Sequence, residues 1–454
     1  MWLYVSAPPP ARHFRWTPWL PWLGLTVAAV WVRGAGLHSG LLYPDGYDYL
    51  LMARGIAAHL QPTLQLGPAG MLFSPPLDAA IKPVFPALTA LLSVLLPLRS
   101  SADVLTVAGG AATVVLTGLV SLRLTGSQLA GLSAGIFALV SPALGFWSGF
   151  SGPDALAPAL ALATVLLALS EHPVAAGVTG ALCAATRPEW MLAAGLVAAS
   201  AAARPSTRTA AANALIAGAF TLAAILGILR PPLGTHLSLH SAASAGAVFT
   251  SSAVGTLLGD DWPLLALAAA GLVVATRRGL GRPAFVLLCT IALLTLAYLT
   301  KNPGSERYLS QLVPLLCVAA GIAVSALSVR LGVVTGVLVA AALLGLTVAE
   351  PSLGHDPFAP VAARLRALRP VTVVTAAPEA YGYLLPGQRI ELMKAGGRGV
   401  VVLDGAQRAY APGLSATGRT LYSVSLKDGF ERPDGTLDYE PARIVRGVVT
   451  VRTG

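Results

Sequence analysis

Long apolar segments separated by short loops constrain this chain more than any other feature. A helix that crosses a bilayer needs roughly 20 mostly apolar residues, and such segments recur from the N-terminal region to residue 349. Of the 454 residues, 55% are hydrophobic and only 11% are charged, whereas a soluble domain is about one quarter charged. The mean hydropathy is +0.71. This pattern predicts a polytopic α-helical membrane protein.

The apolar segments predict about eleven transmembrane helices, given the length that a bilayer requires. The first follows Arg12 and Arg15, and because no small-residue cleavage site follows it, we interpret it as a retained helix and not as a signal peptide. The predicted spans are 17–33, 104–122, 128–147, 154–170, 173–186, 190–203, 209–229, 262–276, 283–299, 308–327 and 331–349.

The first loop after the first span runs from residue 34 to 103 and contains two further helical patterns. One is an expected amphipathic helix from Tyr47 to His59, with its apolar residues around one side. The other is the apolar stretch 83–98, which could be counted as a span. Counting it would reverse the side of every later loop, so we expect an interfacial or re-entrant helix there.

Arginines in the short loops predict the orientation, because Lys and Arg concentrate in cytoplasmic loops. With a cytoplasmic N-terminus, every acidic residue before position 350 except Glu171 falls on the outer side. Acidic residues contribute little to topology, so we interpret their gathering as a working surface. We expect a multi-pass protein of the cell (plasma) membrane with an extracytoplasmic site. The outer acids are Asp45, Asp48, Asp78, Asp103, Asp154, Glu189, Asp260, Asp261 and Glu306.

The composition changes after Ala349, which divides the chain into a transmembrane domain, 1–349, and a C-terminal domain, 350–454. Half of the twenty acidic residues lie in the second part. Its periodicity predicts a small soluble α/β domain, and the parity of the spans puts this domain on the outer side. The expected helices are 358–368 and 378–385, and the expected strands are 371–375, 400–403, 420–426 and 444–451.

The composition also excludes several function classes. The formal net charge is +10, but the arginines occur singly or in pairs between apolar runs, as they do in membrane-flanking loops. We therefore predict no nucleic-acid partner. Cys183, Cys289 and Cys317 all fall inside apolar segments, which favours neither a disulfide framework nor a metal site. His236 and His240 are four residues apart and could bind a metal, but no third ligand is evident nearby.

Several polar residues occur where an outer loop meets an apolar segment, and each has a structural and a functional interpretation. Asp45 and Asp154 stand at expected helix starts, where an aspartate often caps unpaired N–H groups. Arg187 stands at a helix end, where an arginine often anchors a helix by extending its head group toward water. The residue types alone leave both interpretations open.

The motifs around these residues resemble those of the GT-C glycosyltransferases. These polyprenyl-phosphate-sugar-dependent membrane enzymes include the protein O-mannosyltransferases and the lipid A aminoarabinose transferase. Each motif is short, but their order and spacing cover nearly the whole chain. The motifs are Asp45 followed by Tyr49-Leu-Leu-Met-Ala-Arg, Pro75-Pro-Leu, Pro153-Asp-Ala-Leu, Ala185-Thr-Arg-Pro-Glu, Glu306-Arg-Tyr-Leu-Ser-Gln-Leu-Val-Pro-Leu-Leu and Val374-Thr-Ala-Ala-Pro-Glu-Ala-Tyr-Gly-Tyr-Leu.

The resemblance implies a role for each matching residue. Asp45 matches the candidate catalytic base, and Asp154 matches the acid that binds substrate or positions the reacting groups. Gly46 follows Asp45 where many relatives have Glu, so a role for a second acid is absent or passes to Asp48. The donor phosphate is expected at Lys82, Arg187 and Arg307, and further substrate contacts at Asp48, Glu189 and Tyr308.

Elementary chemistry agrees with these roles. In an inverting transfer the acceptor hydroxyl loses its proton as it attacks the anomeric carbon, and a carboxylate can accept that proton. Negative charge then develops on the lipid phosphate, which Arg and Lys stabilise. The expected partners are a polyprenyl-phosphate-linked sugar, a glycan, lipid or protein acceptor, and membrane lipid. No cofactor is predicted, and because Asp45-Gly-Tyr-Asp48 stands where metal-dependent relatives carry Asp-x-Asp, a divalent metal is not favoured.

Two alternatives remain. A lipid or solute transporter or flippase would have charged residues near the midplane of broken helices and an inverted repeat, and the sequence shows no internal repeat. A non-catalytic membrane scaffold whose C-terminal part binds a partner would need neither Asp45 nor Asp154.

Overall fold

The structure is a computed structural model, and it describes most of the chain in separate stretches. These are residues 19–37, 44–66, 71–73, 82–190, 208–229, 261–278, 280, 286–295, 310–347, 358–370, 372–404, 413–424, 430–431, 437–438 and 442–451.

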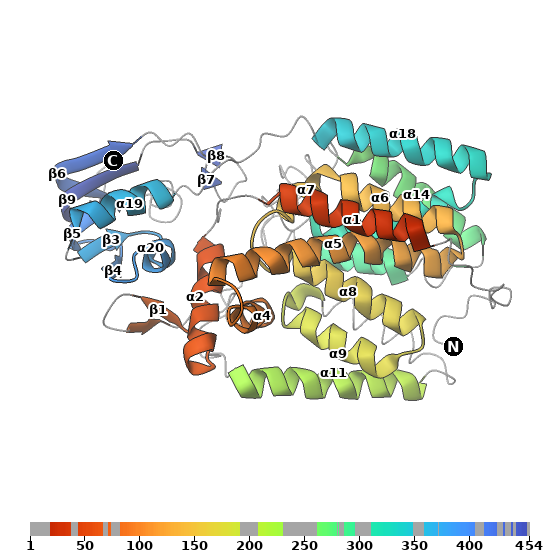
Figure 1. Ribbon diagram of the computed structural model, residues 1–454, viewed down its shortest axis with the longest axis horizontal. Helices are drawn as coiled ribbons and strands as arrows, with labels where there is room; N and C mark the ends of the chain where they lie inside the picture. The colour runs from red at the N-terminus through yellow and green to blue at the C-terminus, as the bar shows by residue number, and fades with distance from the viewer. Residues whose placement is uncertain are drawn as a thin grey trace.

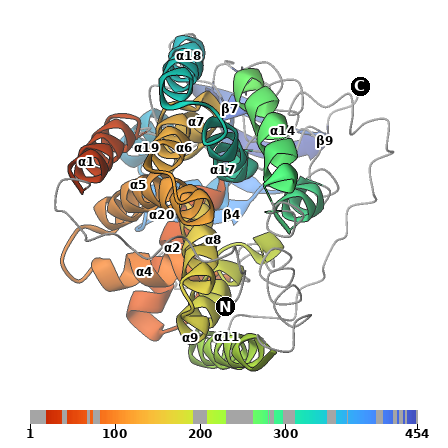
Figure 2. The same cartoon turned by 90° about the vertical axis from the view of Figure 1, so that its right-hand side faces the viewer.

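A bundle of apolar helices forms the larger part of the molecule (Figures 1 and 2). Every predicted span except 190–203 overlaps one of these helices or the helix Val286–Thr295, and residues 191–203 lie outside the described part of the chain. The helices are α1 Leu20–Ala35, α5 Leu98–Thr125, α6 Gln128–Val140, α7 Pro142–Trp147, α8 Pro153–Leu169, α9 Pro173–Ala184, α11 Arg208–Leu229, α14 Trp262–Arg277, α17 Val313–Val324 and α18 Val329–Thr347.

Three described helices are long and apolar enough to cross a membrane, namely Leu98–Thr125, Arg208–Leu229 and Val329–Leu346. Only 6% of the apolar window of Arg208–Leu229 and 11% of that of Val329–Leu346 are buried inside the protein. Phe220 and Leu338, for example, are 74% and 65% exposed. Large apolar surfaces of this kind are unfavourable in water. The exposed apolar faces of α11 and α18 therefore fit a lipid environment.

Local sequence signals set the ends of α5, α6 and α7. Gly126 ends α5 in the left-handed conformation, with φ of 69°, and its N–H donates to the carbonyl of Leu122. This is a typical glycine C-cap. Ser127 then caps α6 by accepting a hydrogen bond from the Ala130 N–H, and Ser141 caps α7 in the same way through Leu144. The chain thus passes from α5 to α6 within two residues, Gly126 and Ser127.

A smaller layer of elements lies between the bundle and the C-terminal part of the chain (Figure 1). It comprises α2 Pro44–His59, α4 Val84–Leu92 and the antiparallel pair β1 Leu64–Leu66 and β2 Met71–Phe73. α4 has nine residues and therefore spans about 14 Å, which is less than half the thickness of a bilayer core. This agrees with the expectation that 83–98 does not cross the membrane by itself.

The expectation of a one-sided amphipathic helix at Tyr47–His59 is wrong. Between residues 47 and 53 every side chain is buried, on all sides of α2, and Tyr49 and Met52 are as well buried as Leu50. The physical reason is that α2 packs against α4 on one side and α20 (Pro378–Leu384) on another. The sequence pattern could not reveal these tertiary neighbours.

The C-terminal part contains a five-stranded mixed sheet with strand order β4-β3-β5-β9-β6. β3 pairs in parallel with β4 and β5, and β9 pairs antiparallel with β5 and β6. The elements are α19 Ala359–Leu368, β3 Thr372–Thr375, α20, β4 Arg389–Leu392, β5 Arg398–Leu403, β6 Leu414–Val424 and β9 Ala442–Val451, together with a short pair β7 Phe430–Glu431 and β8 Leu437–Asp438. Each helix and strand expected here is present, and β4 was not predicted.

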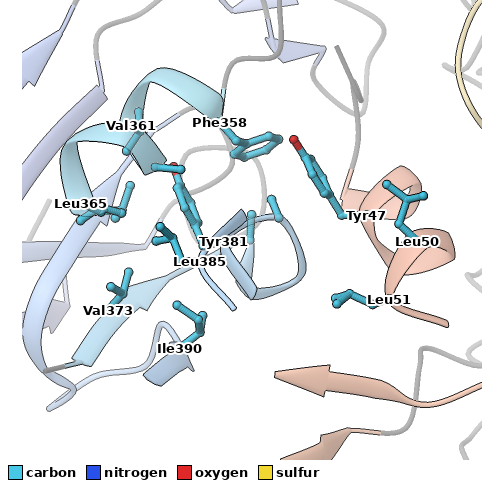
Figure 3. Close-up of a cluster of buried hydrophobic side chains, with 14 of the residues drawn as sticks. Tyr47, Leu50, Leu51, Phe358, Val361, Leu365, Val373, Tyr381, Leu385 and Ile390 are labelled. Atoms are coloured by element: carbon cyan, nitrogen blue, oxygen red, sulfur yellow. The ribbon is translucent and has the colours of Figure 1, made fainter. Parts of the chain in front are cut away.

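Alternating residues of the sheet belong to two different cores. Val373, Val400 and Ile444 join buried residues of α19, α20 and α2 in one cluster (Figure 3). Val374 and Val401 belong to a smaller cluster that α2 does not join. The two-residue period of a strand produces this division. One face of the sheet therefore shares a core with α19, α20 and α2.

Candidate active site

Asp154 and Arg187 form a buried ion pair between the start of α8 and the end of α9. Arg187 Nη2 donates to Asp154 Oδ1, and the two side chains are 1% and 2% exposed. Asp154 lies in the first turn of α8, after the N-cap Gly152, which contributes no side-chain cap. An acidic residue in the first turn is favoured by the helix dipole. The pair brings together two residues that the sequence analysis assigned to the site.

Close packing of α5 against α8 fixes where this pair lies. A Cβ atom added to Gly109 of α5 would come within 3.0 Å of the backbone of Ala155, the residue after Asp154. Only a glycine permits this approach, as at other close contacts between membrane helices. The first turn of α8 is therefore held against α5.

Gln311 is a further buried side chain at this site, and the sequence analysis missed it. It lies in the short 3-10 helix η4 Ser310–Leu312 before α17, and its Nε2 donates to the backbone carbonyl of Asp154 at 3.0 Å. Its Oε1 is buried without a hydrogen-bond partner among the described residues. Gln311 lies within the motif that begins at Glu306, and its place in that motif was the signal that could have identified it.

Lys82 lies beside the end of α9. It directly precedes Pro83 and α4, its side chain is 3% exposed, and the N–H of Val84 donates to the carbonyl of Ala185 at 3.3 Å. Ala185 is two residues before Arg187. The backbone contact therefore keeps the segment with Lys82 close to the segment with Arg187, although 105 residues separate the two positions in the sequence.

The other predicted site residues fall into two groups. Asp48 is buried on α2, and Glu189 is half-buried in the 3-10 helix η2 Pro188–Trp190, directly after Arg187. The side chain of Asp45 and the residues Arg307 and Tyr308 lie outside the described part of the chain.

An apolar groove is lined by Cys183 and Trp190, which precede and follow Arg187 in the sequence. It contains about 870 Å³ of empty space, counting the part that opens to the outside. Residues of α5, α8, α9, α17 and the helix Val286–Thr295 line it, together with Trp190. The N–H of Trp190 donates to the carbonyl of Arg187 at 3.1 Å, so the ring that lines the groove and the buried guanidinium are joined by one turn of backbone.

Further buried polar contacts gather at the same end of the bundle. Ser151, which is three residues before Asp154, donates a hydrogen bond from its Oγ to Asp103 of α5. Ser141 Oγ donates to Asp261 Oδ1 at 2.9 Å. Asp261 occupies the N-cap position of α14, where its side chain makes no cap hydrogen bond. Hydrophobic periodicity cannot show which hydroxyl a distant carboxylate will accept.

Arg33 is a buried cation that the sequence analysis did not single out. It is 3% exposed in the last turn of α1, and its Nη2 donates to the carbonyl of Ala138 at 2.8 Å. Its stem packs against Gly110 of α5. Gly110, beside Arg33, and Gly109, beside Ala155, are neighbours in α5. This helix therefore packs against both Arg33 and the first turn of α8.

Within the described stretches, no three His, Cys, Asp or Glu side chains are grouped so that they could hold a metal ion. His236 and His240 lie outside those stretches. The described site therefore consists of a carboxylate, a guanidinium, an ammonium group and an amide, beside an apolar groove.

Comparison with solved structures shows which fold holds this site. ArnT from Cupriavidus metallidurans in the apo state superposes with a TM-score of 0.61, over 93% of this chain and 97% of that chain, at 13% identity. The same protein bound to undecaprenyl phosphate gives a TM-score of 0.59 at 14% identity over the same shares of the two chains. The chain has the GT-C fold. The expected GT-C fold is thereby confirmed, while the number of spans and the extracytoplasmic C-terminal domain stay predictions.

A second GT-C structure agrees. The oligosaccharyltransferase of Archaeoglobus fulgidus in the apo form has a TM-score of 0.54 and 13% identity, over 83% of this chain and 64% of that chain. No family model matches the sequence, and no curated protein matches it. At these identities the GT-C fold is recognised by its arrangement in space.

Proposed function

We propose that this chain is a membrane glycosyltransferase that transfers a monosaccharide from a polyprenyl-phosphate donor to an extracytoplasmic acceptor. The observation that carries the proposal is the buried Asp154–Arg187 pair, in which Arg187 belongs to the short segment between Cys183 and Trp190, two residues that line an apolar groove. A polyprenyl phosphate has the complementary chemistry, because its chain is apolar and its head group is anionic. The GT-C fold supports the proposal, since one structure with this fold holds undecaprenyl phosphate.

Arg187 and Lys82 are the proposed ligands of the donor phosphate. A guanidinium has five N–H donors, so Arg187 can bind Asp154 and still direct donors at a phosphate. Asp154 then acts by orienting the guanidinium. Charge-assisted hydrogen bonds of this kind are strongest in a site that excludes water, and the burial of Lys82, Asp154 and Arg187 fits that requirement. Arg307 is proposed as a third cation, with Asp48, Glu189 and Tyr308 as further substrate contacts.

Asp45 is the proposed general base of an inverting reaction. Its carboxylate accepts the proton of the acceptor hydroxyl while that oxygen forms a bond to the anomeric carbon. The bond between the anomeric carbon and the phosphate oxygen breaks, and the polyprenyl phosphate leaves with the electron pair. Lys82 and Arg187 stabilise the charge that develops on that oxygen. Asp45 belongs to the first turn of α2, a helix that packs beside α4, which follows Lys82.

A transporter or flippase is the alternative, and it would move a lipid-linked sugar without cleaving it. The experiment that separates the two uses the full chain in proteoliposomes with a panel of radiolabelled polyprenyl-phosphate monosaccharides and extracted envelope acceptors. The transferase proposal expects free polyprenyl phosphate and a labelled acceptor. Asp45→Asn is expected to abolish both products, whereas Glu171→Gln, an acid in the exposed turn between α8 and α9, is expected to retain them. Intact donor moved across the bilayer, with no cleavage by the wild type, would overturn the proposal.

A further inference from the structure

An aromatic contact joins α2 to the C-terminal part of the chain. The ring of Tyr47 lies 5.6 Å from the ring of Phe358, which precedes α19, and 5.6 Å from the ring of Tyr383 on α20. Figure 3 shows Tyr47 pointing from α2 toward Phe358. Tyr47 and Phe358 are 0% and 2% exposed. The contact therefore lies in the interior, between elements that are more than 300 residues apart in the sequence.

Tyr383 also contacts α2 at a second point. The guanidinium carbon of Arg54 lies 5.1 Å from the centre of the Tyr383 ring, within the range of a cation–π contact. Arg54 follows Tyr47 by seven residues, which is two helical turns, so both project from one face of α2. The single ring of Tyr383 thus contacts α2 at both of these turns.

Charged groups of α2 and α5 influence the pKa of the same tyrosine. Burial raises the pKa of Tyr383; Arg54 and Arg99 oppose that rise, and Asp103 adds to it. Asp103 accepts the hydrogen bond from Ser151 in the turn that leads into α8. The charges that act on Tyr383 therefore come from α2 and from the start of α5.

We propose that Tyr383 is a positioning residue that couples the C-terminal sheet region to α2, the helix that carries Asp45 and Asp48. The inference rests on the proposed function, because Asp45 and Asp48 flank Tyr47 in α2. A catalytic group must be held within about 0.5 Å of its productive position. The first turn of α2 receives this support from a ring that belongs to a different part of the fold.

The chain offers a matched control for this contact. Within the C-terminal part, the guanidinium carbon of Arg364 lies 4.9 Å from the centre of the Tyr422 ring. Tyr422→Ala removes a cation–π contact of the same kind that does not involve α2. A loss of general stability would affect Tyr383→Ala and Tyr422→Ala alike, whereas a loss of positioning would affect only the first.

Two measurements on the full chain test the inference. In sugar transfer, Tyr383→Ala is expected to lower kcat by about 10- to 100-fold with little change in the donor KM. Tyr383→Phe is expected to retain most of kcat, and Tyr422→Ala is expected to resemble the wild type. In hydrogen exchange, the backbone amides of residues 47–59 are expected to lose protection in Tyr383→Ala and to keep it in Tyr383→Phe and Tyr422→Ala.

The two measurements test separate parts of the inference. Unchanged protection of 47–59 in Tyr383→Ala would overturn the coupling, whatever the activity. Equal losses of kcat in Tyr383→Ala and Tyr422→Ala would overturn the positioning role and leave only a stabilising one. If the wild type transfers no sugar from any donor of the panel, the proposed function fails, and the exchange experiment alone decides whether Tyr383 holds α2.

Discussion

Arg187 donates a hydrogen bond to the carboxylate of Asp154, and neither side chain is more than 2% exposed. A buried ion pair is rarely a net source of stability, because taking two charges out of water costs nearly as much as their attraction returns. Such a pair is more easily explained by what it orients. Here it fixes a guanidinium in the segment between Cys183 and Trp190, two residues that line an apolar groove.

Removing the carboxylate alone is expected to destabilise the protein. Asp154→Ala leaves the Arg187 guanidinium buried without its counter-charge, which costs about 3–5 kcal/mol in comparable cases. Asp154→Asn keeps an oxygen acceptor and is expected to lose less. Thermal unfolding in detergent measures both. The double variant Asp154→Leu, Arg187→Met is expected to recover stability without recovering sugar transfer. If the single variant Asp154→Ala were as stable as the wild type, that result would contradict the burial of the pair.

Replacing Arg187 by lysine tests whether the guanidinium serves the reaction. The charge is kept but the planar set of donors is lost, so Arg187→Lys is expected to lower kcat by roughly 100-fold. Arg123→Lys is the matched control, because Arg123 donates from α5 to the carbonyl of Leu169 at the last residue of α8. The control should keep its activity. Equal rates for the two variants would argue against a role for Arg187 at the phosphate.

The apolar groove is expected to bind the chain of the donor lipid. Polyprenyl phosphate at 100 times its Kd should stabilise the protein by about 2.7 kcal/mol, seen as a higher midpoint of thermal unfolding, and polyprenol without phosphate should do less. Ala161→Leu introduces bulk into the groove lining and should reduce the shift. Ala212→Leu, on the exposed face of α11, should leave it unchanged; a shift that survives Ala161→Leu would mean that the lipid binds elsewhere.

The hydrogen bond between Ser141 and Asp261 is expected to join α7 to α14. Hydrogen bonds to charged groups contribute about 1.5–3 kcal/mol, so Ser141→Ala and Asp261→Asn should each lower the free energy of unfolding. A double-mutant cycle should show a coupling of about 0.5–3 kcal/mol. Additive effects of the two changes would mean that the contact contributes nothing to stability.

Tyr383 is expected to make the fold sensitive to alkaline pH. Burial raises its pKa in the folded protein, so the unfolded chain, in which a tyrosine has a pKa of about 10, releases this proton first. The contribution of Tyr383 to stability is therefore complete below pH about 10 and declines above it. Tyr383→Phe should flatten this decline. Thermal unfolding between neutral and strongly alkaline pH measures the difference, and parallel curves would contradict the raised pKa.

Much of the fold was predictable from local patterns. Hydrophobic length identified helices such as α11 and α18, whose apolar faces are exposed, and two-residue alternation identified β9. The prediction failed for α2, where the apolar residues of one face were recognised but the burial of the other face depends on α4 and α20. It also missed β4, a strand of four residues.

The sequence by itself determined which segments are apolar and where the polar residues lie between them, because these properties depend on residue type and spacing alone. The resemblance of the motifs around them then nominated Lys82, Asp154 and Arg187. Only the tertiary structure decided that Asp154 pairs with Arg187, that Gln311 reaches the backbone of Asp154, and that the ring of Tyr383 contacts α2. Each of these contacts joins residues far apart in the chain, so its existence depends on helix packing, which no local pattern specifies.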